Sequence, residues 1–306
     1  MNAAKVQIQS PMTSPYHPGE LAVQSRTGVL EEALRLGKGI HSTISPAAQD
    51  FLRYQRMAVV ATVKASGRVW ASLLTGELGF MQVVEERTVR LDAAPVFGVP
   101  LSENLLTADE IGVLVIDLAN RRRLRLNGKA EVLTNGGIYV HTKQVYFNCP
   151  KYIQSRHLDA DVTKLRTEPE IRRTETLTDF EQHWIAQTDT FFIASFHPES
   201  GADASHRGGY PGFVRILNES LLVFADYSGN NMFNTLGNIS VNAQAGLLFI
   251  DFERGSTLQL TGKARIIWEA ERVAEFAGAE RLVEFQIDSA LEITNASPLR
   301  WRFVEY

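Results

Sequence analysis

The chain has 306 residues, 44% of them hydrophobic and 22% charged, which is enough apolar material for one large core or two ordinary ones. Its formal charge of −4 lacks the basic excess that nucleic-acid phosphates or an acidic membrane surface would require, so neither is an expected partner. A single cysteine, Cys149, excludes an intrachain disulfide, and the lack of a signal-like or membrane-length apolar run predicts a cytoplasmic protein.

The first 134 residues divide into an arm and a β-rich domain. Residues 1–44 predict an N-terminal arm that contains a helix at 28–36. A Ser-Pro start predicts a further helix at 45–54, which opens a domain spanning 45–134. Short apolar or alternating segments bounded by Gly, Pro, Asn and Asp predict its strands at 59–63, 88–91, 112–117 and 123–131.

The remainder of the chain contains a linker and a second domain. Residues 135–178, with a GG pair, the string CPKYIQ and a charged stretch, predict a linker with some helix. The second domain is expected over 179–306, with edge helices at 179–187 and 270–276. Its stretch LFIDFERGSTLQLTGKA predicts a hairpin with its turn at 253–256. Both domains are therefore expected to be mainly β, and the recurring hairpins favour small barrels.

The two domains are copies of one another. Residues 76–93 align without a gap to residues 209–226, at an offset of 133. Residues 112–133 match residues 246–267 with nine identities in 22 positions, at an offset of 134. A period of this length corresponds to a whole domain rather than to a solenoid unit, so the sequence predicts a tandem duplication.

Four strings of the second copy carry a family resemblance: ASHRGGYPGF, FADYSGNN, NTLGNISVNAQAGLLFIDF and LQLTGKA. They resemble the FMN-binding split barrel of pyridoxamine 5'-phosphate oxidase-like proteins, and more narrowly the two-copy flavin-nucleotide-binding proteins of that superfamily. FNCPKYIQSR is similar to the segment that follows the barrel there, and YHPGELAVQ resembles the arm of the longer members. The resemblance implies tandem FMN-binding split barrels, mainly β with flanking helices, and a flavin in the cleft between two barrels.

The segment SHRGG offers the groups that a flavin phosphate needs. Ser205 supplies a hydroxyl group, and Arg207 supplies a permanently charged guanidinium fork. Gly208, which has no side chain, lets the backbone come close to the phosphate. An ordinary surface loop with an exposed arginine is the alternative. At the 133 offset Arg207 falls on Leu74, whereas Ser205 falls on Ser72. The contrast predicts a working phosphate site in the second copy and a degenerate one in the first.

The turn DYSGNNMFNTLGN is the second candidate element of the site. Plain turn chemistry is the alternative, because asparagine tolerates left-handed backbone angles. Several asparagines beside a helix start, whose N–H groups favour an anion, instead indicate donors for the flavin. The corresponding stretch APVFGVPLSENL has only Asn104. The expected cofactor site therefore includes Asp226, Tyr227, Gly229, Asn230, Asn231, Asn234 and Thr235, with His206, Phe213 and Val214 near SHRGG.

The resemblance implies that the first copy forms the partner wall of the flavin cleft. The candidate contacts are Lys151, Tyr152 and Gln154 of CPKYIQ, with Ser72 and Thr75 as further candidates. A packed helix start is the alternative for CPKYIQ. The run RRRLR at 121–125 falls at an expected hairpin tip, where solvated charge is the ordinary explanation.

Two functions of different classes fit these residues. One is an FMN-dependent oxidoreductase acting on an unidentified small molecule, with NAD(P)H as a diffusing reductant because no Rossmann fingerprint is present. The other is a non-catalytic flavin carrier or sensor, since the candidates bind FMN and none is an evident acid or base. A third possibility is that the protein has lost the cofactor and that the barrel serves only for dimerisation. No histidine spacing indicates a metal site, and a homodimer is compatible with the sequence. The expected substrate contacts are His17, Glu20, His206 and Tyr227.

Overall fold

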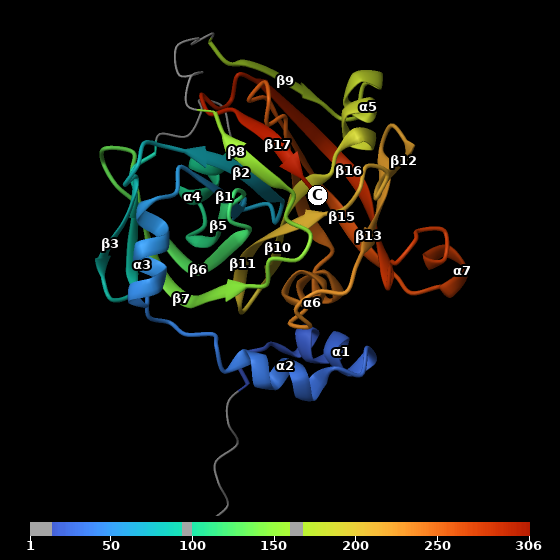
Figure 1. Cartoon of the computed structure of the whole chain (residues 1–306), viewed down its shortest axis with the longest axis horizontal. Coiled ribbons are helices and arrows are strands. Elements are labelled where there is room, and N and C mark those ends of the chain that lie inside the picture. Colours follow the sequence, from blue (N-terminus) through green and yellow to red (C-terminus); the bar gives the residue numbers. More distant parts are fainter. Residues whose placement is uncertain (1–13, 94–99, 160–167) are drawn as a thin grey trace, which may run out of the picture.

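The computed structural model describes residues 14–93, 100–159 and 168–306 (Figure 1). No helix in these ranges is both long and apolar enough to cross a membrane. The helices expected at 28–36, 45–54, 179–187 and 270–276 correspond to α2, α3, α5 and α7. The helices are α1 Pro18–Arg26, α2 Leu30–Gly37, α3 Pro46–Arg53, α4 Pro100–Leu105, α5 Asp179–Gln187, α6 Asn234–Val241 and α7 Ala270–Val273.

Most strands belong to two antiparallel sheets with the same connectivity. The strand order is β2-β1-β5-β6-β7-β4-β3 in the first sheet and β11-β10-β14-β15-β16-β13-β12 in the second, so each strand has a counterpart nine numbers later. The expected turn at 253–256 joins β14 to β15. The predicted duplication is therefore confirmed. The strands are β1 Met57–Val63, β2 Val69–Thr75, β3 Met81–Glu85, β4 Thr88–Leu91, β5 Glu110–Asp117, β6 Arg122–Val132, β7 Ile138–Asn148, β8 Ser155–Leu158, β9 Glu170–Thr174, β10 Thr190–His197, β11 Gly201–Gly208, β12 Val214–Asn218, β13 Leu221–Asp226, β14 Gln244–Ile250, β15 Thr257–Ile267, β16 Arg281–Thr294 and β17 Trp301–Glu305.

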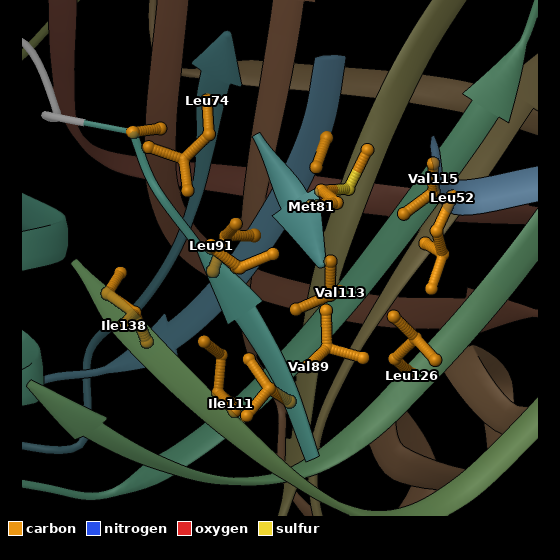
Figure 2. Packing of buried hydrophobic residues seen from close by; sticks show 14 of the residues in the cluster. Leu52, Leu74, Met81, Val89, Leu91, Ile111, Val113, Val115, Leu126 and Ile138 are labelled. Carbon is orange, nitrogen blue, oxygen red and sulfur yellow. The ribbon is translucent and has the colours of Figure 1, made fainter. Parts of the chain in front are cut away.

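Each sheet encloses an apolar core. In the first sheet, buried side chains from all seven strands meet in one cluster, which Leu52 of α3 and Leu101 of α4 join (Figure 2). The second sheet encloses a corresponding cluster, in which the ring of Phe191 packs against Phe224 and Phe249. A sheet whose strands all contribute to one enclosed cluster is a barrel, so the mainly β, two-barrel prediction is confirmed.

A further apolar cluster joins the two barrels. Strand β1 is buried on both faces. Its residues Ala58 and Val60 face the first core, while Val59 and Ala61 pack with Phe192 of β10 between the barrels. A strand with two buried faces reads as a continuous apolar run rather than an alternating one, which explains the sequence MAVVATV.

Two equivalent glycines bring the backbones of the barrels together. A Cβ at Gly112 of β5 would lie 2.6 Å from Ala202 O of β11, and one at Gly246 of β14 would lie 2.7 Å from Val69 O of β2. The two glycines are related by the 134-residue offset of the repeat. The same close approach therefore occurs twice, and the two barrels pair with approximate two-fold symmetry.

The predicted boundary of the first barrel at residue 134 is too early. Strand β7 pairs with both β6 and β4, so the first barrel continues to residue 148. Beyond it, β8 pairs with β17, and β9 joins β16 of the second sheet. The helix expected in the linker is wrong, because the described residues between 135 and 178 contain strands and no helix. Buried residues alternate with more exposed ones over the first half of β7, and this period of two is the strand signal that the linker assignment overlooked.

The N-terminal arm folds into two helices that lie beside α6 (Figure 1). A capping box opens α1, in which Glu20 Oε2 accepts the backbone N–H of His17 at 2.8 Å and His17 Nδ1 accepts that of Gly19 at 3.1 Å. The Tyr16 hydroxyl donates to Ala33 O at 2.8 Å and so ties the start of α1 to α2. The arm is therefore a folded unit with its own internal contacts.

We expect Gly112→Val to lower the free energy of unfolding by about 3 kcal/mol, because the added side chain meets backbone atoms of a buried strand. Gly229→Ala is the control, since its added methyl group would lie 3.9 Å from the nearest atom, Tyr227 O. Urea unfolding followed by circular dichroism measures both. Equal stability of the two variants would contradict the close pairing of the barrels.

Candidate functional site

A cavity lies between the two barrels beside the end of β11. Its walls come from β11, the loop at 227–233 and the first turn of α6 in the second barrel, and from β6 and the segment after β7 in the first. The lining residues are Arg123, Arg125, Lys151, Tyr152, Ser205, His206, Arg207, Gly208, Ala225, Asp226, Tyr227, Gly229, Asn230, Asn231, Phe233, Asn234, Thr235 and Leu236. Both copies of the repeat thus contribute to one site.

Ser205 is the meeting point of two arginines from different barrels. Its hydroxyl oxygen accepts hydrogen bonds from Arg125 Nη2 at 2.6 Å and from Arg207 Nη1 at 3.2 Å. Because arginine only donates, both lone pairs of the oxygen are used and the serine proton remains available to a ligand. The alternation of β11 places Ser205 and Arg207 on the same face of the strand.

Arg125 crosses from the first barrel into the second. Its Nη1 lies 3.0 Å from each carboxylate oxygen of Asp203 and 3.3 Å from Asn234 Oδ1. Arg125 is 6% exposed and Asp203 is 4% exposed, so each charge offsets the desolvation cost of the other. The ion pair fixes the guanidinium of Arg125 relative to the second barrel.

His206 is a neutral hydrogen-bond donor. Arg123 Nη1 lies 2.9 Å from His206 Nδ1, and because arginine only donates, Nδ1 is the acceptor and the ring proton lies on Nε2. Burial and the positive charge of Arg123 hold the pKa of His206 well below its usual range, so the ring is uncharged at neutral pH. Burial, helped by the like charge of Arg125, lowers the pKa of Arg123 to about 10, which leaves Arg123 cationic at neutral pH.

The loop before α6 presents the start of that helix to the cavity. Two of its residues, Asn231 with φ 58° and Phe233 with φ 59°, adopt left-handed backbone angles. Such angles are strained for phenylalanine and persist where the surroundings require them. Phe233 is the N-cap of α6 and provides no side-chain cap, so the first N–H groups of the helix lack the usual side-chain acceptor. Asn234 and Thr235, at this helix start, line the cavity.

The segment after β7 closes another side of the cavity with Lys151 and Tyr152. The ring of Tyr152 stacks on Tyr227 with 5.4 Å between centroids. The hydroxyl of Tyr152 donates to the backbone oxygen of Ser228 at 3.0 Å. These contacts join the first barrel to the loop of the second.

The cavity carries an excess of positive charge. Four cationic side chains line it against one carboxylate, Asp226. That carboxylate is already paired, because Arg281 Nε lies 2.7 Å from Oδ2 and Arg207 Nη2 lies 3.7 Å from Oδ1. The remaining positive charge suits an anionic ligand.

Five buried polar atoms of the cavity wall have no hydrogen-bond partner within the described ranges. Buried polar groups in proteins are normally paired, so a group of unpaired ones needs an explanation. Four of the five are nitrogen atoms that carry a proton, and a ligand rich in acceptor oxygens would satisfy them. The atoms are Arg123 Nε, Arg125 Nε, His206 Nε2, Arg207 Nε and Thr235 Oγ1.

The equivalent position of the first barrel is uncharged among the described residues. Ser72 is retained and donates to Gln259 Oε1 at 3.0 Å, and Gln259 is the counterpart of Arg125. Leu74, the counterpart of Arg207, is buried in the core of the first barrel. Part of the matching stretch APVFGVPLSENL lies outside the described residues. Both arginines that meet at Ser205 are thus replaced by uncharged side chains at the equivalent position.

Thirteen of the sixteen residues expected at the cofactor site line this cavity. Phe213 and Val214 instead point into the core of the second barrel, where β12 begins. Gln154 donates to Gly209 O at 3.0 Å and anchors the segment after β7 to the end of β11 without lining the cavity. The further candidate Thr75 does not line it either.

The expectation of solvated charge for the run 121–125 is wrong for Arg123 and Arg125. The turn lies at 118–121, so both arginines belong to β6 and alternate with the core residues Leu124 and Leu126. Their side chains leave the opposite face of the strand and reach the second barrel. The signal for this placement was the period of two in RLRLN, which marks a strand rather than a tip.

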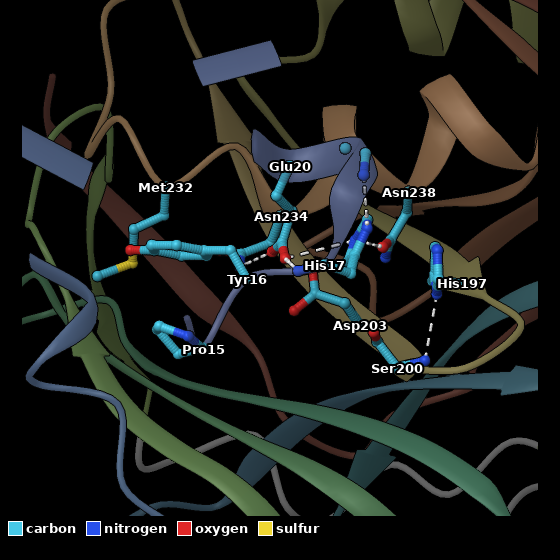
Figure 3. Close-up of polar contacts among 12 residues, drawn as sticks. Pro15, Tyr16, His17, Glu20, His197, Ser200, Asp203, Met232, Asn234 and Asn238 are labelled. Carbon is cyan, nitrogen blue, oxygen red and sulfur yellow. Dashed lines mark hydrogen bonds and ion pairs between the residues drawn. The ribbon is translucent and has the colours of Figure 1, made fainter. Parts of the chain in front are cut away.

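His17 and Glu20, which were expected to touch a substrate, lie at a smaller polar pocket behind the cavity wall (Figure 3). Glu20 Oε1 accepts a hydrogen bond from Asn234 Nδ2 at 2.5 Å. Asp203 and Asn238 complete this part of the pocket. Neither arm residue lines the cavity, and Glu20 is linked to it through Asn234.

The two paired barrels share this cationic cavity, and together they define a tandem split-barrel protein. A family model described as pyridoxamine 5'-phosphate oxidase matches residues 44–170 and 177–305, so the chain belongs to that family. No curated protein matches the sequence.

Solved structures similar to this chain come from several bacteria. HupZ of group A Streptococcus is 12% identical with a TM-score of 0.32, and the match covers 38% of this chain and 98% of HupZ. An FMN-binding protein of Syntrophomonas wolfei is 10% identical with a TM-score of 0.28, over 36% of this chain and 82% of its own. An FAD-binding protein of Mesorhizobium loti is 9% identical with a TM-score of 0.30, over 41% of this chain and 98% of its own.

We expect Arg125→Leu to lower the free energy of unfolding by about 3–5 kcal/mol, because it leaves the charge of Asp203 buried without a cation. Adding Asp203→Asn should recover most of that loss, since the uncompensated charge is then removed. Urea unfolding of the wild type, both single variants and the double variant at pH 7 gives the coupling energy. Strictly additive losses would contradict a direct pair.

Proposed function

We propose that this protein binds one FMN per chain, with the phosphate held in the cationic cavity of the second barrel. The observation that carries the proposal is the set of five unpaired buried polar atoms, gathered where four cationic side chains outnumber one carboxylate. A phosphate ester supplies a double negative charge and several acceptor oxygens, which is what this wall lacks.

The residues present fit a flavin mononucleotide. Arg207 offers a planar fork that suits phosphate oxygens, and the hydroxyl proton of Ser205 is free to donate beside it. Arg125, whose two Nη atoms are already bonded, adds its unpaired Nε–H. The start of α6 adds backbone N–H groups and the positive end of its dipole. The neutral Nε2–H of His206 adds a donor that does not titrate near neutral pH.

A bound flavin would supply hydride or electron transfer, and the protein would bind and orient it and exclude water. We propose that the protein is an FMN-dependent oxidoreductase acting on a small molecule in the cytoplasm, with NAD(P)H as a diffusing reductant. Tyr152 and Tyr227, whose rings stack on one another, line both the cationic cavity and a second, mostly apolar groove. We propose that a substrate approaches the flavin from this groove.

A non-catalytic flavin carrier or sensor is the second candidate, and one observation favours it. The single carboxylate of the cavity, Asp226, is paired with Arg281 at 2.7 Å, and His206 is held neutral. Neither group is therefore a free acid or base at neutral pH. A carrier would need no such group, whereas an oxidoreductase that adds or removes a proton on its substrate would need one.

We expect Arg207→Leu, which installs the residue found at position 74, to weaken FMN binding at least about tenfold, because it removes charge-assisted hydrogen bonds to the phosphate. Arg302→Leu is the control, since Arg302 is exposed on β17. Titration of the apoprotein with FMN, followed by quenching of flavin fluorescence, measures affinity and stoichiometry. Two FMN per chain, or equal affinities of the two variants, would contradict the proposed site.

Anaerobic mixing of the FMN-loaded protein with NADH or NADPH separates the two candidate functions. An oxidoreductase that uses a diffusing reductant should bleach the flavin absorbance near 450 nm at a rate that rises with reductant concentration. Free FMN at the same concentration provides the reference rate. A loaded protein that is reduced no faster than free FMN would contradict the oxidoreductase and favour the carrier.

A further inference from the structure

The N-terminal arm crosses α6 so closely that only glycine fits at the contact. A Cβ at Gly19 of α1 would clash with the backbone oxygen of Gly237, and one at Gly237 would lie 2.7 Å from the Cα of Glu20. Close backbone approach of this kind requires both positions to lack a side chain. The arm is therefore seated on the helix whose first turn lines the cationic cavity.

Side chains of the arm hold the polar loop that leads into α6. Gln24, fully buried in α1, donates through Nε2 to Met232 O at 2.9 Å. Its Oε1 has no hydrogen-bond partner among the described residues, and burying that unpaired oxygen costs free energy. The bond to Met232 O is thus the one hydrogen bond that the described structure gives this buried amide. Glu32 of α2 accepts a hydrogen bond from Asn231 Nδ2 at 3.0 Å.

Asn234 links the arm directly to the cavity. Its Nδ2 donates to Glu20 Oε1 at 2.5 Å, and its Oδ1 accepts from Arg125 Nη1 at 3.3 Å. Glu20 is 4% exposed, and burial raises its pKa to about 7. A continuous chain of hydrogen bonds thus runs from α1 through Asn234 to a cation of the proposed phosphate site.

His17 seats the start of the arm on the same helix (Figure 3). Its Nδ1 accepts the backbone N–H of Gly19, so the proton lies on Nε2, which donates to Asn238 Oδ1 at 2.8 Å. Burial and the neighbouring His197, stacked 3.9 Å away, lower the pKa of His17 to about 4, so this donor is neutral at neutral pH. Asn238 in turn donates to Ser195 Oγ at 2.9 Å.

The equivalent helix of the first barrel shows that these contacts are specific to one copy. Asn104 of α4 is the counterpart of Asn238 and donates to Thr62 Oγ1 at 2.9 Å, as Asn238 donates to Ser195. However, Asn104 Oδ1 has no partner among the described residues, whereas Asn238 Oδ1 accepts from the arm. Glu103 stands at the place of Gly237, so α4 lacks the glycine contact that the arm requires.

We propose that the arm is a positioning element of the anion site, in which Glu20 and Gln24 hold Asn234 and the loop before α6 in the geometry that receives the flavin phosphate. The proposal rests on the proposed function for the identity of the ligand, but not for the ordering of the loop. Because coupling between two events is reciprocal, a bound phosphate group also strengthens the attachment of the arm.

Hydrogen–deuterium exchange of the full chain tests the ordering of the loop without any ligand. We expect Gln24→Met, which keeps the volume but removes the donor, and Glu20→Ala to raise exchange at 229–238 about tenfold, with β10 and β14 unchanged. Ser25→Ala, at the exposed neighbour of Gln24 on α1, is the matched control. Unchanged exchange at 229–238 in both arm variants would overturn the proposal, and protection of β10 and β14 reports that each variant is folded.

Titration with FMN supplies the second readout. We expect the Kd for FMN to rise about tenfold in Gln24→Met and Glu20→Ala but not in Ser25→Ala, and FMN to slow exchange of α1 in the wild type. A merely structural arm would leave its own exchange insensitive to FMN, and that result would overturn the coupling. If the wild type binds no FMN but exchange at 229–238 is still faster in the arm variants, the proposed function fails. The role of the arm in positioning the loop then stands.

Discussion

The buried pair of Arg125 and Asp203 is the interaction on which the site depends. It spans the contact between the barrels, so a cation that serves the second barrel is supplied by the first. Either charge without the other would be an uncompensated buried ion, so the pair requires both barrels to contribute to it. The same guanidinium also donates to Ser205 and Asn234. Association of the two halves and formation of the cavity are therefore a single event.

The features that the sequence could predict are those with a local cause. Period-two patterning and turn residues identified the strands, because each of these signals lies within a few residues of the chain. The offset between copies identified the duplication, because it needs only a comparison of the sequence with itself. Arg123 and Arg125 were misplaced because their burial depends on a surface about 80 residues further along the chain. Phe213 and Val214 were assigned to the site by resemblance, whereas their own strand turns them into the core.

The second barrel accommodates an arrangement that would be unfavourable elsewhere in the chain. Unpaired buried donors, a left-handed phenylalanine at Phe233 and a helix without a side-chain cap all occur around one cavity. Each costs free energy in the isolated protein, and local rules of this kind are broken mainly where a function compensates for the cost. In the described part of the first barrel, Leu74 takes the place of Arg207 and packs into the core.

Covalent linkage of the two barrels has a consequence for how such a site can change. In a symmetric dimer of identical subunits, every substitution occurs on both sides of the two-fold axis. A residue at the interface therefore cannot change in one subunit while it stays the same in the other. Here Arg125 and Gln259 occupy related positions in one polypeptide, yet each meets a different partner, Ser205 or Ser72. In a tandem duplication the two halves need not stay identical, so a residue on one side of the pseudo-axis could change without any change in its counterpart.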